Sequence, residues 1–503
     1  MATLSVAAIL AENARRRPRK TALVEGDLRL SFEEVWRRAR AQAGALTALG
    51  VRPGDRVALM APNTAAFPIA YYAIAAAGAV VVPVHLLLSA PEVEHVLQDS
   101  GATLLLVHPA QAGTGRAAAD ALGVRAVTLG EESDRLAADA EPLPSYVTRA
   151  ADDPAVVFYT SGTTGVPKGA VLTHFNLVMN ATVNAFDAND IRADDIALGA
   201  LPLFHAFGQT VSLNSTWRAG ATLVLLPRFD AARAIELMAE EKVNTFHGVP
   251  TMFVALAAAA ADAGTLPELR VCISGGASLP VAVLERFEAA FGARIHEGYG
   301  LSETSPTATV NQPVFGTRAG TIGHPLWGVD VEIARAEVEG RVELLPPGEL
   351  GEVVIRGHNV FSGYLGRPEA TAEAVVDGWF RTGDLGTKDE EGFLRIVDRK
   401  KDVIIRGGYN VYPREVEEVL MRHPGVAQVA VIGLPDELHG EEVCAVVVPA
   451  QGTAPDAAGI TEWSKEHLGR HKYPRRVEFA AALPLGPSMK VLKRELRAQY
   501  TGR

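Results

Sequence analysis

Short runs of apolar and β-branched residues alternate along this chain with segments of helical length, and this alternation restricts the fold more than any other feature. The runs that predict buried strands occupy residues 56–60, 79–84, 103–107, 155–159, 222–226 and 271–274. The segments that predict helices include residues 31–49, 91–98, 231–241 and 280–290. Strands that alternate with helices form parallel sheets covered on both faces. The sequence therefore predicts an α/β fold.

The pattern changes after about residue 320, where glycine, proline and short strand-like runs replace the alternation. Predicted strands at 329–333 and 351–356 indicate a barrel-like β subdomain at the end of the large domain. A charged segment at 398–402 then precedes a region that has the length and the mixed pattern of one small domain. We predict a large N-terminal domain of parallel α/β sheets over residues 1–400 and a small, mobile α+β C-terminal domain over 401–503.

Charge and cysteine content exclude several classes of protein. The 48 basic and 59 acidic side chains give a net charge of −11, and no basic face that would bind nucleic acid stands out. Two cysteines cannot form a disulfide framework, and they suit a reducing cytoplasm. Residues 57–91 carry no charged side chain, but Pro62, Pro68, Gly78 and Pro83 interrupt them, whereas a spanning helix needs ~20 unbroken apolar residues. We predict a cytoplasmic protein with no nucleic-acid partner and no integral membrane segment.

A segment rich in glycine and hydroxyl groups follows the predicted strand at 155–159. Its glycines let the backbone approach an anion closely, so that consecutive N–H groups can converge on phosphate oxygens. Its hydroxyls add donors and its lysine adds a positive charge, although the Walker arrangement is absent. A plain surface loop is the alternative, but this composition over ten residues favours phosphate binding. The candidate residues are Thr160, Ser161, Gly162, Thr163, Thr164, Gly165 and Lys168.

This segment resembles the phosphate-binding signature of the AMP-forming acyl-CoA synthetase, or adenylate-forming, family, and further matches follow in the family's order. Residues 299–304 resemble its adenine and magnesium motif, and residues 379–384 resemble its ribose motif. Residues 398–402 and 407–413 resemble its hinge and thiolation segment. Residues 484–490 lie where the family keeps a catalytic lysine, although Met489 stands where the family has glycine. The resemblance extends from about residue 155 to about residue 495.

The resemblance implies a two-step reaction that uses ATP, Mg²⁺ and coenzyme A. A carboxylate attacks the α-phosphate of MgATP to give an acyl-adenylate and pyrophosphate, and a thiol then displaces AMP. Because the first step brings two anions together, fixed positive charge and a metal ion are the main catalytic resources. Lys490 is implied to bridge the carboxylate and the α-phosphate, and Glu303 to bind Mg²⁺ through hard oxygen atoms. The implied catalytic residues are Lys490, Glu303, His205 and Thr163.

The remaining roles follow from the same resemblance. Asp384 is implied to accept hydrogen bonds from the ribose hydroxyls, and Arg399 to donate to them. Lys401 is implied to be the hinge of a domain rotation that brings Gly408 and Tyr409 to coenzyme A. The other nucleotide-binding positions are Gly275, Gly276, Ala277, Glu297, Gly298, Tyr299 and Thr304. The positions implied to line the acyl site are His205, Phe207, Gly208, Ser274, Gly300 and Leu301.

The class of acid is inferred from Gly298, which precedes the Tyr-Gly motif. Family members that activate small diacids usually place an arginine at this position, whereas glycine would leave a second carboxylate buried and unpaired. Phe204, Phe207 and Val211 suggest an apolar tail, so we predict a monocarboxylic acid, most simply a fatty acid. An aryl acid such as a cinnamate and a small diacid stay as alternatives.

Coenzyme A is the predicted thiol, because the sequence has no carrier-domain attachment site of the Asp-Ser-Leu type. Transfer to a separate carrier protein is the alternative. A non-catalytic nucleotide-binding scaffold is the alternative from another class of function. The resemblance also implies a lysine acetyltransferase that acts on Lys490 as a partner.

Overall fold

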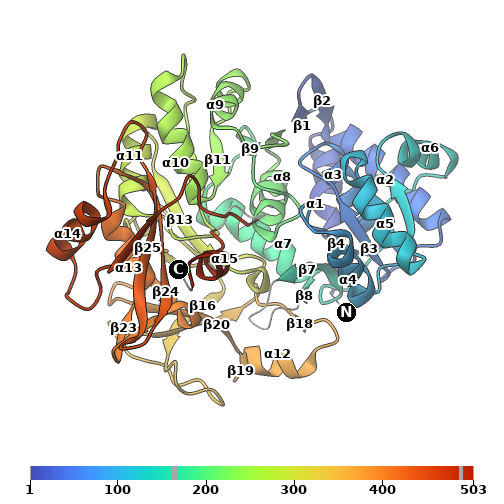
Figure 1. Cartoon of the computed structure of the whole chain (residues 1–503). Helices are drawn as coiled ribbons and strands as arrows, with labels where there is room; N and C mark the ends of the chain where they lie inside the picture. The colour runs from blue at the N-terminus through green and yellow to red at the C-terminus, as the bar shows by residue number, and fades with distance from the viewer. Residues whose placement is uncertain (1, 161–166, 487–490, 502–503) are drawn as a thin grey trace.

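The computed structural model describes residues 2–160, 167–486 and 491–501, which form four sheets. Figure 1 shows the N-terminal helices and the C-terminal unit at opposite ends of the molecule, with the segments between residues 170 and 310 in the middle. The predicted α/β class is confirmed. The two largest sheets are mixed rather than purely parallel, and their antiparallel pairs lie toward their edges.

The largest sheet has nine strands in the order β15-β14-β13-β12-β11-β9-β10-β1-β2. Its central strands, from β13 to β1, are parallel, whereas β2, β14 and β15 pair antiparallel at the two edges. The strands are β1 Thr21–Glu25, β2 Leu28–Ser31, β9 Ile196–Gly199, β10 Thr222–Leu225, β11 Thr245–Gly248, β12 Val271–Ser274, β13 Ile295–Gly300, β14 Thr307–Val310 and β15 His324–Pro325.

The second sheet has seven strands in the order β18-β8-β7-β4-β3-β5-β6. Strands β7, β4, β3, β5 and β6 are parallel, and β8 returns antiparallel beside β7. The strands are β3 Arg56–Met60, β4 Val80–Pro83, β5 Leu104–Val107, β6 Arg125–Thr128, β7 Pro154–Thr160, β8 Lys168–Thr173 and β18 Gly363–Tyr364. The last of these comes from a segment 190 residues further along the chain, and it extends the sheet beyond β8.

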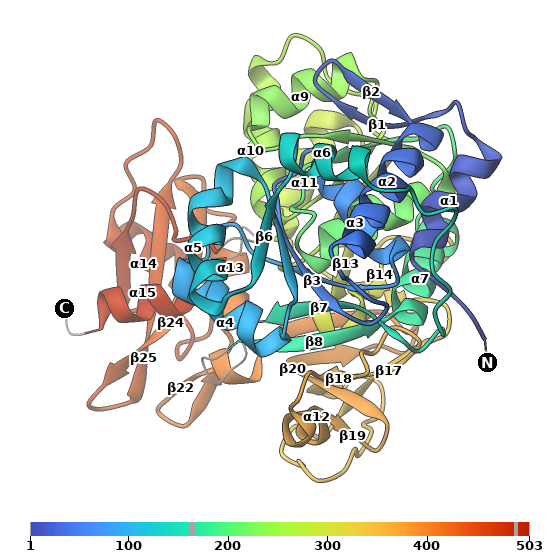
Figure 2. The ribbon, with the colours of Figure 1, turned by 90° about the vertical axis from the view of Figure 1, so that its right-hand side faces the viewer.

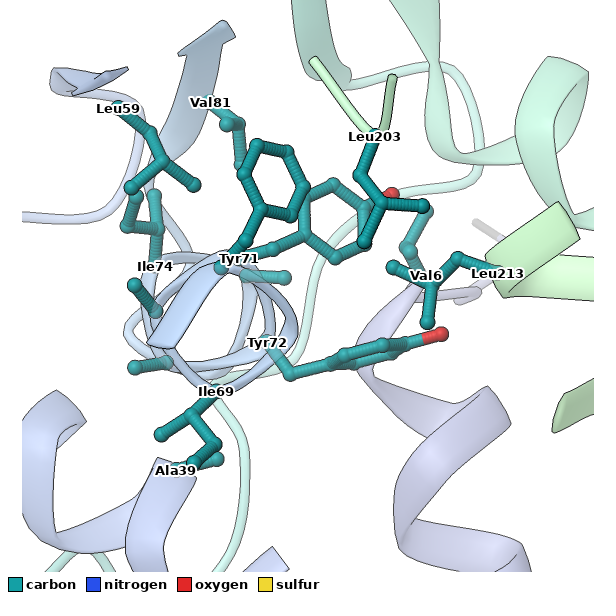
Figure 3. Packing of buried hydrophobic residues seen from close by; sticks show 14 of the residues in the cluster. Val6, Ala39, Leu59, Ile69, Tyr71, Tyr72, Ile74, Val81, Leu203 and Leu213 are labelled. Atoms are coloured by element: carbon teal, nitrogen blue, oxygen red, sulfur yellow. The ribbon is translucent and has the colours of Figure 1, made fainter. Parts of the chain in front are cut away.

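The predicted charge-free stretch forms a buried helix and a buried strand. Helix α3, Ala66–Ala76, has ten buried residues of eleven and packs against the long helix α2, Phe32–Ala48. A helix that is apolar on all sides belongs in a protein core. Figure 3 shows Tyr71 and Tyr72 of α3 beside Leu203 and Leu213, and the Tyr72 hydroxyl donates to Asn214 Oδ1 at 2.8 Å. No helix in the described part of the chain is both long and apolar enough to cross a membrane.

The other helices of the large domain cover the two sheets, and most predicted bounds are confirmed to within two residues. Helix α2 begins after Ser31, whose hydroxyl accepts the Glu34 N–H while the Glu34 carboxylate accepts the Ser31 N–H. The helices are α1 Ala7–Arg16, α4 Ala90–Ser100, α5 Ala112–Leu122, α6 Glu131–Asp139, α7 His174–Val183, α8 Thr216–Ala219, α9 Ala231–Glu240, α10 Pro250–Ala259 and α11 Val281–Phe291.

An antiparallel sheet of five strands forms the β subdomain that the sequence predicted after residue 320. Its strands are β16 Val329–Ala334, β17 Gly351–Gly357, β19 Val375–Val376, β20 Trp379–Lys388 and β21 Leu394–Arg399, with helix α12 at Pro368–Ala374. The turn Lys400–Asp402 then leads out of this sheet into the C-terminal unit. The predicted boundary between residues 400 and 401 falls in this turn.

The C-terminal unit is an α+β arrangement of one sheet and three helices within its described residues. Figure 2 shows it beside the large domain, and one cluster of buried apolar residues continues from β11–β13 and α11 into its helix α13. Its elements are β22 Ile404–Arg406, β23 Tyr409–Val411, α13 Pro413–Leu420, β24 Val426–Asp436, β25 Gly440–Pro449, α14 Ala457–His467, β26 Arg476–Phe479 and α15 Lys493–Tyr500.

Candidate active site

The two strands that flank the predicted phosphate loop meet at its ends. Thr160 ends β7, Lys168 begins β8, and the two residues are register partners in the antiparallel pair. Five predicted loop residues, Ser161, Gly162, Thr163, Thr164 and Gly165, lie outside the described residues. The described flanks therefore carry one hydroxyl and one ammonium group to the same edge of the seven-stranded sheet.

Glu303 lies at this edge, in the short turn Ser302–Thr304 that follows β13. Only 8% of the residue is exposed. Its Oε1 atom accepts the Tyr364 hydroxyl at 2.9 Å and lies 3.4 Å from the Thr160 hydroxyl. The Lys168 ammonium lies 5.3 Å from the centroid of the Tyr364 ring. Three elements that are distant in sequence thus bring a carboxylate, two hydroxyls and a cation together.

The surroundings of Glu303 fit a magnesium ion. Among the described residues no lysine, arginine or histidine forms an ion pair with this nearly buried carboxylate, and an uncompensated buried charge is costly. Mg²⁺ prefers carboxylate and hydroxyl oxygens and usually shares them with substrate phosphates. Burial, reinforced by the Glu303 charge, raises the pKa of Tyr364, so its phenol stays a proton donor. Glu303 is therefore the residue that would hold the ion.

The ribose motif brings three side chains together. The Tyr299 hydroxyl donates to Asp384 Oδ2 at 2.6 Å, and Arg399 Nε lies 3.3 Å from Asp384 Oδ1. Asp384 and Arg399 are register partners on β20 and β21. Burial and the Asp384 charge raise the pKa of Tyr299 well above its usual value, so the phenol remains a donor. Asp384 is 5% exposed, and this arrangement offers carboxylate acceptors beside a guanidinium donor.

A small cavity, with an accessible volume of about 10 Å³, lies where the sequence predicted the acyl site. The Phe207 N–H donates to His205 Nδ1 at 3.3 Å, which fixes the orientation of the His205 ring. A Cβ atom at position 208 would lie 2.2 Å from the Pro202 carbonyl oxygen, so only glycine fits there. The lining residues are Leu201, Pro202, His205, Phe207, Gly208, Val249 and Gly276.

Three further residues of the predicted acyl and adenine sites, Ser274, Gly300 and Thr304, are closely packed. Ser274 is fully buried at the end of β12, and its Oγ has no hydrogen-bond partner among the described residues. A Cβ at Gly300 would lie 1.8 Å from the Pro306 carbonyl oxygen, which explains the glycine. The Thr304 hydroxyl accepts the Leu301 N–H at 2.8 Å and so stabilises the turn that carries Glu303.

Glu297 lies at a different surface from the Glu303 cluster. Its Oε1 accepts the Leu279 N–H at 3.0 Å and lies 3.9 Å from Nη2 of Arg414, which begins helix α13 of the C-terminal unit. Its Oε2 has no hydrogen-bond partner in the described chain. Burial outweighs the opposing effect of Arg414 and raises the pKa of Glu297 to about 7. Glu297 therefore contributes to the interface with the C-terminal unit, and its nucleotide contact stays a prediction.

Comparison with known proteins decides the family. The model of the AMP-binding enzyme family matches residues 10–365, and that of the AMP-binding enzyme C-terminal domain matches residues 415–490. The chain belongs to this family. It is an AMP-forming acyl-CoA synthetase, as the ordered motifs predicted.

Similar proteins cover nearly the whole synthetase. A feruloyl-CoA synthase from Amycolatopsis is 42% identical over 97% of this chain and 97% of its own length. The long-chain-fatty-acid–CoA ligase FadD13 of Mycobacterium tuberculosis is 39% identical over 98% of each chain. The ATP-bound structure of MatB from Rhodopseudomonas palustris superposes with a TM-score of 0.91 at 33% identity, over 99% of each chain. The synthetase therefore forms acyl-CoA in an ATP-dependent reaction. Its relatives include ligases for aryl acids and for fatty acids, so the comparisons do not decide which type of acid it uses.

The residues predicted for the second half-reaction lie in the C-terminal unit of the synthetase. Tyr409 is 61% exposed, and its ring packs on His471 of the same unit, with no hydrogen bond or ring contact to Thr160, Glu303 or Tyr364. Gly408 has a φ of +82°, which explains the glycine. Lys401 is exposed in the turn Lys400–Asp402. Lys490 lies outside the described residues, so its catalytic role and its acetylation stay predictions.

Two contacts of the synthetase were missed from the sequence. Tyr364 was not predicted, because a two-residue strand in a glycine-rich segment carries no pattern that links it to Glu303. Arg414 was not predicted either, because its partner Glu297 belongs to another domain and had been assigned to the nucleotide. The alternation of strands and helices carries no information about either contact, because both contacts form only when segments distant in sequence come together in the folded protein.

Proposed function

We propose that this synthetase activates a compact aryl monocarboxylic acid of the cinnamate type and transfers the acyl group to coenzyme A. The observation that carries the proposal is the cavity at His205 and Phe207. Its accessible volume is only about 10 Å³, so the cavity has to open for any acid, and a compact planar acid requires less opening than a long alkyl chain. The name of the feruloyl-CoA synthase among the relatives supports the same class of acid.

The charge of the cavity supports a monocarboxylic acid. His205 is the one titratable side chain among the described lining residues, so a second carboxylate would be buried without a counter-charge. A Cβ at Gly298 would lie 3.2 Å from the Thr309 carbonyl oxygen, so a longer side chain there requires a local shift. Both observations argue against a small diacid.

A fatty acid is the second candidate. The lining of the cavity is apolar apart from His205, and a long-chain-fatty-acid–CoA ligase is among the similar proteins. A fatty acid would require the cavity to lengthen beyond Phe207 or Val249 when the acid binds.

In the first half-reaction the acid supplies its own nucleophile, so the protein has to position two anions and to stabilise charge. Because His205 Nδ1 accepts the Phe207 N–H, the neutral ring carries its proton on Nε2, and we propose that this ring orients the acid at the cavity. Asp384 and Arg399 orient the ribose, and Lys168 and Lys490 provide positive charge for the phosphates. When bound by Glu303, Mg²⁺ would neutralise phosphate charge.

In the second half-reaction the thiol of coenzyme A displaces AMP. Gly408 and Tyr409 are exposed at a β-hairpin of the C-terminal unit, and we propose that a rotation about Lys401 carries this hairpin to the pantetheine arm. Because the two half-reactions need different residues near one acyl group, such an exchange suits the chemistry.

Acid-dependent exchange of labelled pyrophosphate into ATP tests this function, because it reports the first half-reaction alone. Over a panel of cinnamates, benzoates and fatty acids of increasing length, we expect ferulate and cinnamate to exceed the long-chain acids by ~100-fold in kcat/KM. The Lys490→Ala variant is the matched control, and its exchange should fall by orders of magnitude.

The other outcomes decide between the alternatives. A preference for long-chain acids would replace the proposal by the second candidate. Absence of exchange with every acid would indicate a nucleotide-binding scaffold. Thioester formation with coenzyme A, compared with a phosphopantetheinylated carrier protein, identifies the acceptor in the second half-reaction.

A further inference from the structure

Tyr364 occupies an unusual place between the two charged groups of the site. Its hydroxyl donates to Glu303 Oε1 at 2.9 Å, and its ring centroid lies 5.3 Å from the Lys168 ammonium. The cation thus lies on the ring, whereas the carboxylate lies at its hydroxyl end. Lys168 and Glu303 form no ion pair with each other, although both lie at the same edge of the sheet.

The structure holds Tyr364 firmly in this place. Strand β18 pairs antiparallel with β8, which aligns Tyr364 with Ala170. The Tyr364 N–H donates to the Thr371 hydroxyl at 2.9 Å, and the ring packs edge-on against Phe361 at 4.8 Å. A backbone pairing, a hydrogen bond and a ring contact therefore fix the phenol before any substrate binds.

We propose that Tyr364 is a positioning residue that keeps Glu303 and Lys168 apart, so that the carboxylate stays available to a divalent cation and the ammonium to phosphate. If the two side chains met, each would neutralise the other, and neither would serve the nucleotide. The Tyr364 hydroxyl, a neutral donor, binds Oε1 of Glu303, whereas Oε2 of Glu303 accepts no hydrogen bond within the described chain. This inference rests on the ATP-dependent activity of the family, and it does not depend on which acid is the substrate.

The proposal separates the two parts of the phenol. Tyr364→Phe removes the hydroxyl but keeps the ring beneath Lys168. The hydrogen bond to Glu303 is then lost, while the ring still separates Lys168 from Glu303. Tyr364→Leu removes both, so Lys168 can approach Glu303. We expect Tyr364→Phe to raise the Mg²⁺ concentration for half-maximal pyrophosphate exchange by ~10-fold, with the KM for ATP at saturating Mg²⁺ unchanged. Tyr364→Leu should raise both quantities.

A measurement without catalysis accompanies the kinetics. Binding of Mn²⁺ in the presence of ATP, followed by electron paramagnetic resonance with no acid added, should weaken ~10-fold in Tyr364→Phe and be lost in Glu303→Gln. Tyr159→Phe is the matched control, because Tyr159 is on β7 of the same sheet and its hydroxyl donates to Asp99 at 2.8 Å rather than to Glu303. This control should bind Mn²⁺ as the unaltered protein does.

Unchanged Mn²⁺ binding and unchanged Mg²⁺ dependence in Tyr364→Phe would overturn the proposal, and so would an equal loss in Tyr159→Phe. If Tyr364→Phe does not fold, Thr371→Val decides instead, because it removes the hydroxyl that accepts the Tyr364 N–H at 2.9 Å and so loosens the phenol without changing Glu303 or Lys168. A weaker Mn²⁺ affinity supports the proposal, and an unchanged one refutes it. Since Mn²⁺ binding needs no acid, a wrong assignment of the acid would leave this result intact.

Discussion

At the scale of single residues, Gly275 controls the space that is left for the acyl group. A Cβ atom at this position would lie 3.1 Å from Cζ and 3.2 Å from Cε1 of Phe207, which is closer than ordinary contact. The Phe207 ring lines the cavity, so a methyl group at 275 has to displace the ring or the backbone. We therefore expect the glycine to affect selectivity among acids through the Phe207 ring.

We expect Gly275→Ala to lower kcat/KM for the largest accepted acids by ~10-fold and to spare the smallest, because a lost methylene-sized volume has about this effect. Pyrophosphate exchange over the acid panel measures the change. Gly264→Ala is the matched control, because a Cβ there meets nothing within 4 Å. A parallel loss for every acid would contradict a role in selectivity.

At this scale the site predictions rest on local motifs, and the structure brings several of the predicted residues into contact in pairs. Thr160, Glu303, Tyr299 and Asp384 come from three motifs, and the structure joins them by hydrogen bonds. The hydroxyl that completes the surroundings of Glu303 comes from Tyr364, whose position depends on pairing between strands far apart in sequence. No local pattern contains that information.

At the scale of elements, helix α13 docks on the large domain through charged groups. Val281 N–H donates to Glu418 Oε2 at 3.3 Å, and Arg286 Nη2 donates to the Met421 carbonyl at 3.0 Å. Glu297 lies beneath this contact and faces Arg414, Glu418 and Arg395. Burial also raises the pKa of Glu418. The interface thus holds two carboxyl groups whose pKa values burial raises.

The folded state binds the Glu297 proton more tightly than the unfolded chain does, since the pKa rises from 4.5 to about 7. Its contribution to stability is therefore complete below the unfolded value and is lost as the pH rises through 7. The loss amounts to about 3 kcal/mol. We expect Glu297→Gln, which stays neutral, to match the unaltered protein in melting temperature at pH 5 and to exceed it at pH 8.5.

Differential scanning fluorimetry across this pH range measures the effect. Glu285→Gln serves as the control, since Glu285 is exposed on the same side of the interface, in α11. The same pH dependence in Glu297→Gln as in the unaltered protein would show that Glu297 does not titrate in this range.

Strand and helix bounds were predictable because periodicity is local, and residues 56–60 and 271–274 form β3 and β12 as predicted. The antiparallel edges of the sheets were not predictable. Strand β1 pairs antiparallel with β2, which begins three residues after β1 ends, and parallel with β10 on its other side. The apolar pattern of β1 does not indicate which neighbour runs in which direction.

At the scale of the whole molecule, the turn Lys400–Asp402 joins two sheets that have separate hydrogen-bond networks. Lys400 Nζ donates to the Ala336 carbonyl at 2.6 Å on the side of the large domain. Asp402 lies 3.5 Å from Arg497 on the side of the C-terminal unit. Lys401, between them, is exposed, so a change of its backbone angles breaks neither contact.

We expect Lys401→Pro to keep acid-dependent pyrophosphate exchange and to lower thioester formation by ~100-fold, about 2.7 kcal/mol of barrier. Proline fixes φ near −65° and restricts residue 400, so the two units are held in one orientation. Separate assays of the two half-reactions measure this. Lys401→Ala is the control, because it removes the charge alone. Equal loss of both half-reactions in Lys401→Pro would indicate misfolding, and equal retention would mean that the hinge lies elsewhere.

The pairing of β8 with β18 has a consequence for how the protein is made. A ribosome synthesises ~5–20 residues per second, so about 190 residues separate the two strands by on the order of 10–40 s. During that time the outer edge of β8 is unpaired, and an open edge invites pairing with other chains. Glu303 also lacks its hydrogen bond from the Tyr364 hydroxyl until residue 364 has been synthesised. A nascent chain therefore acquires its complete nucleotide site only in the last third of its synthesis, and chaperones that cover open strand edges are of most use to it before then.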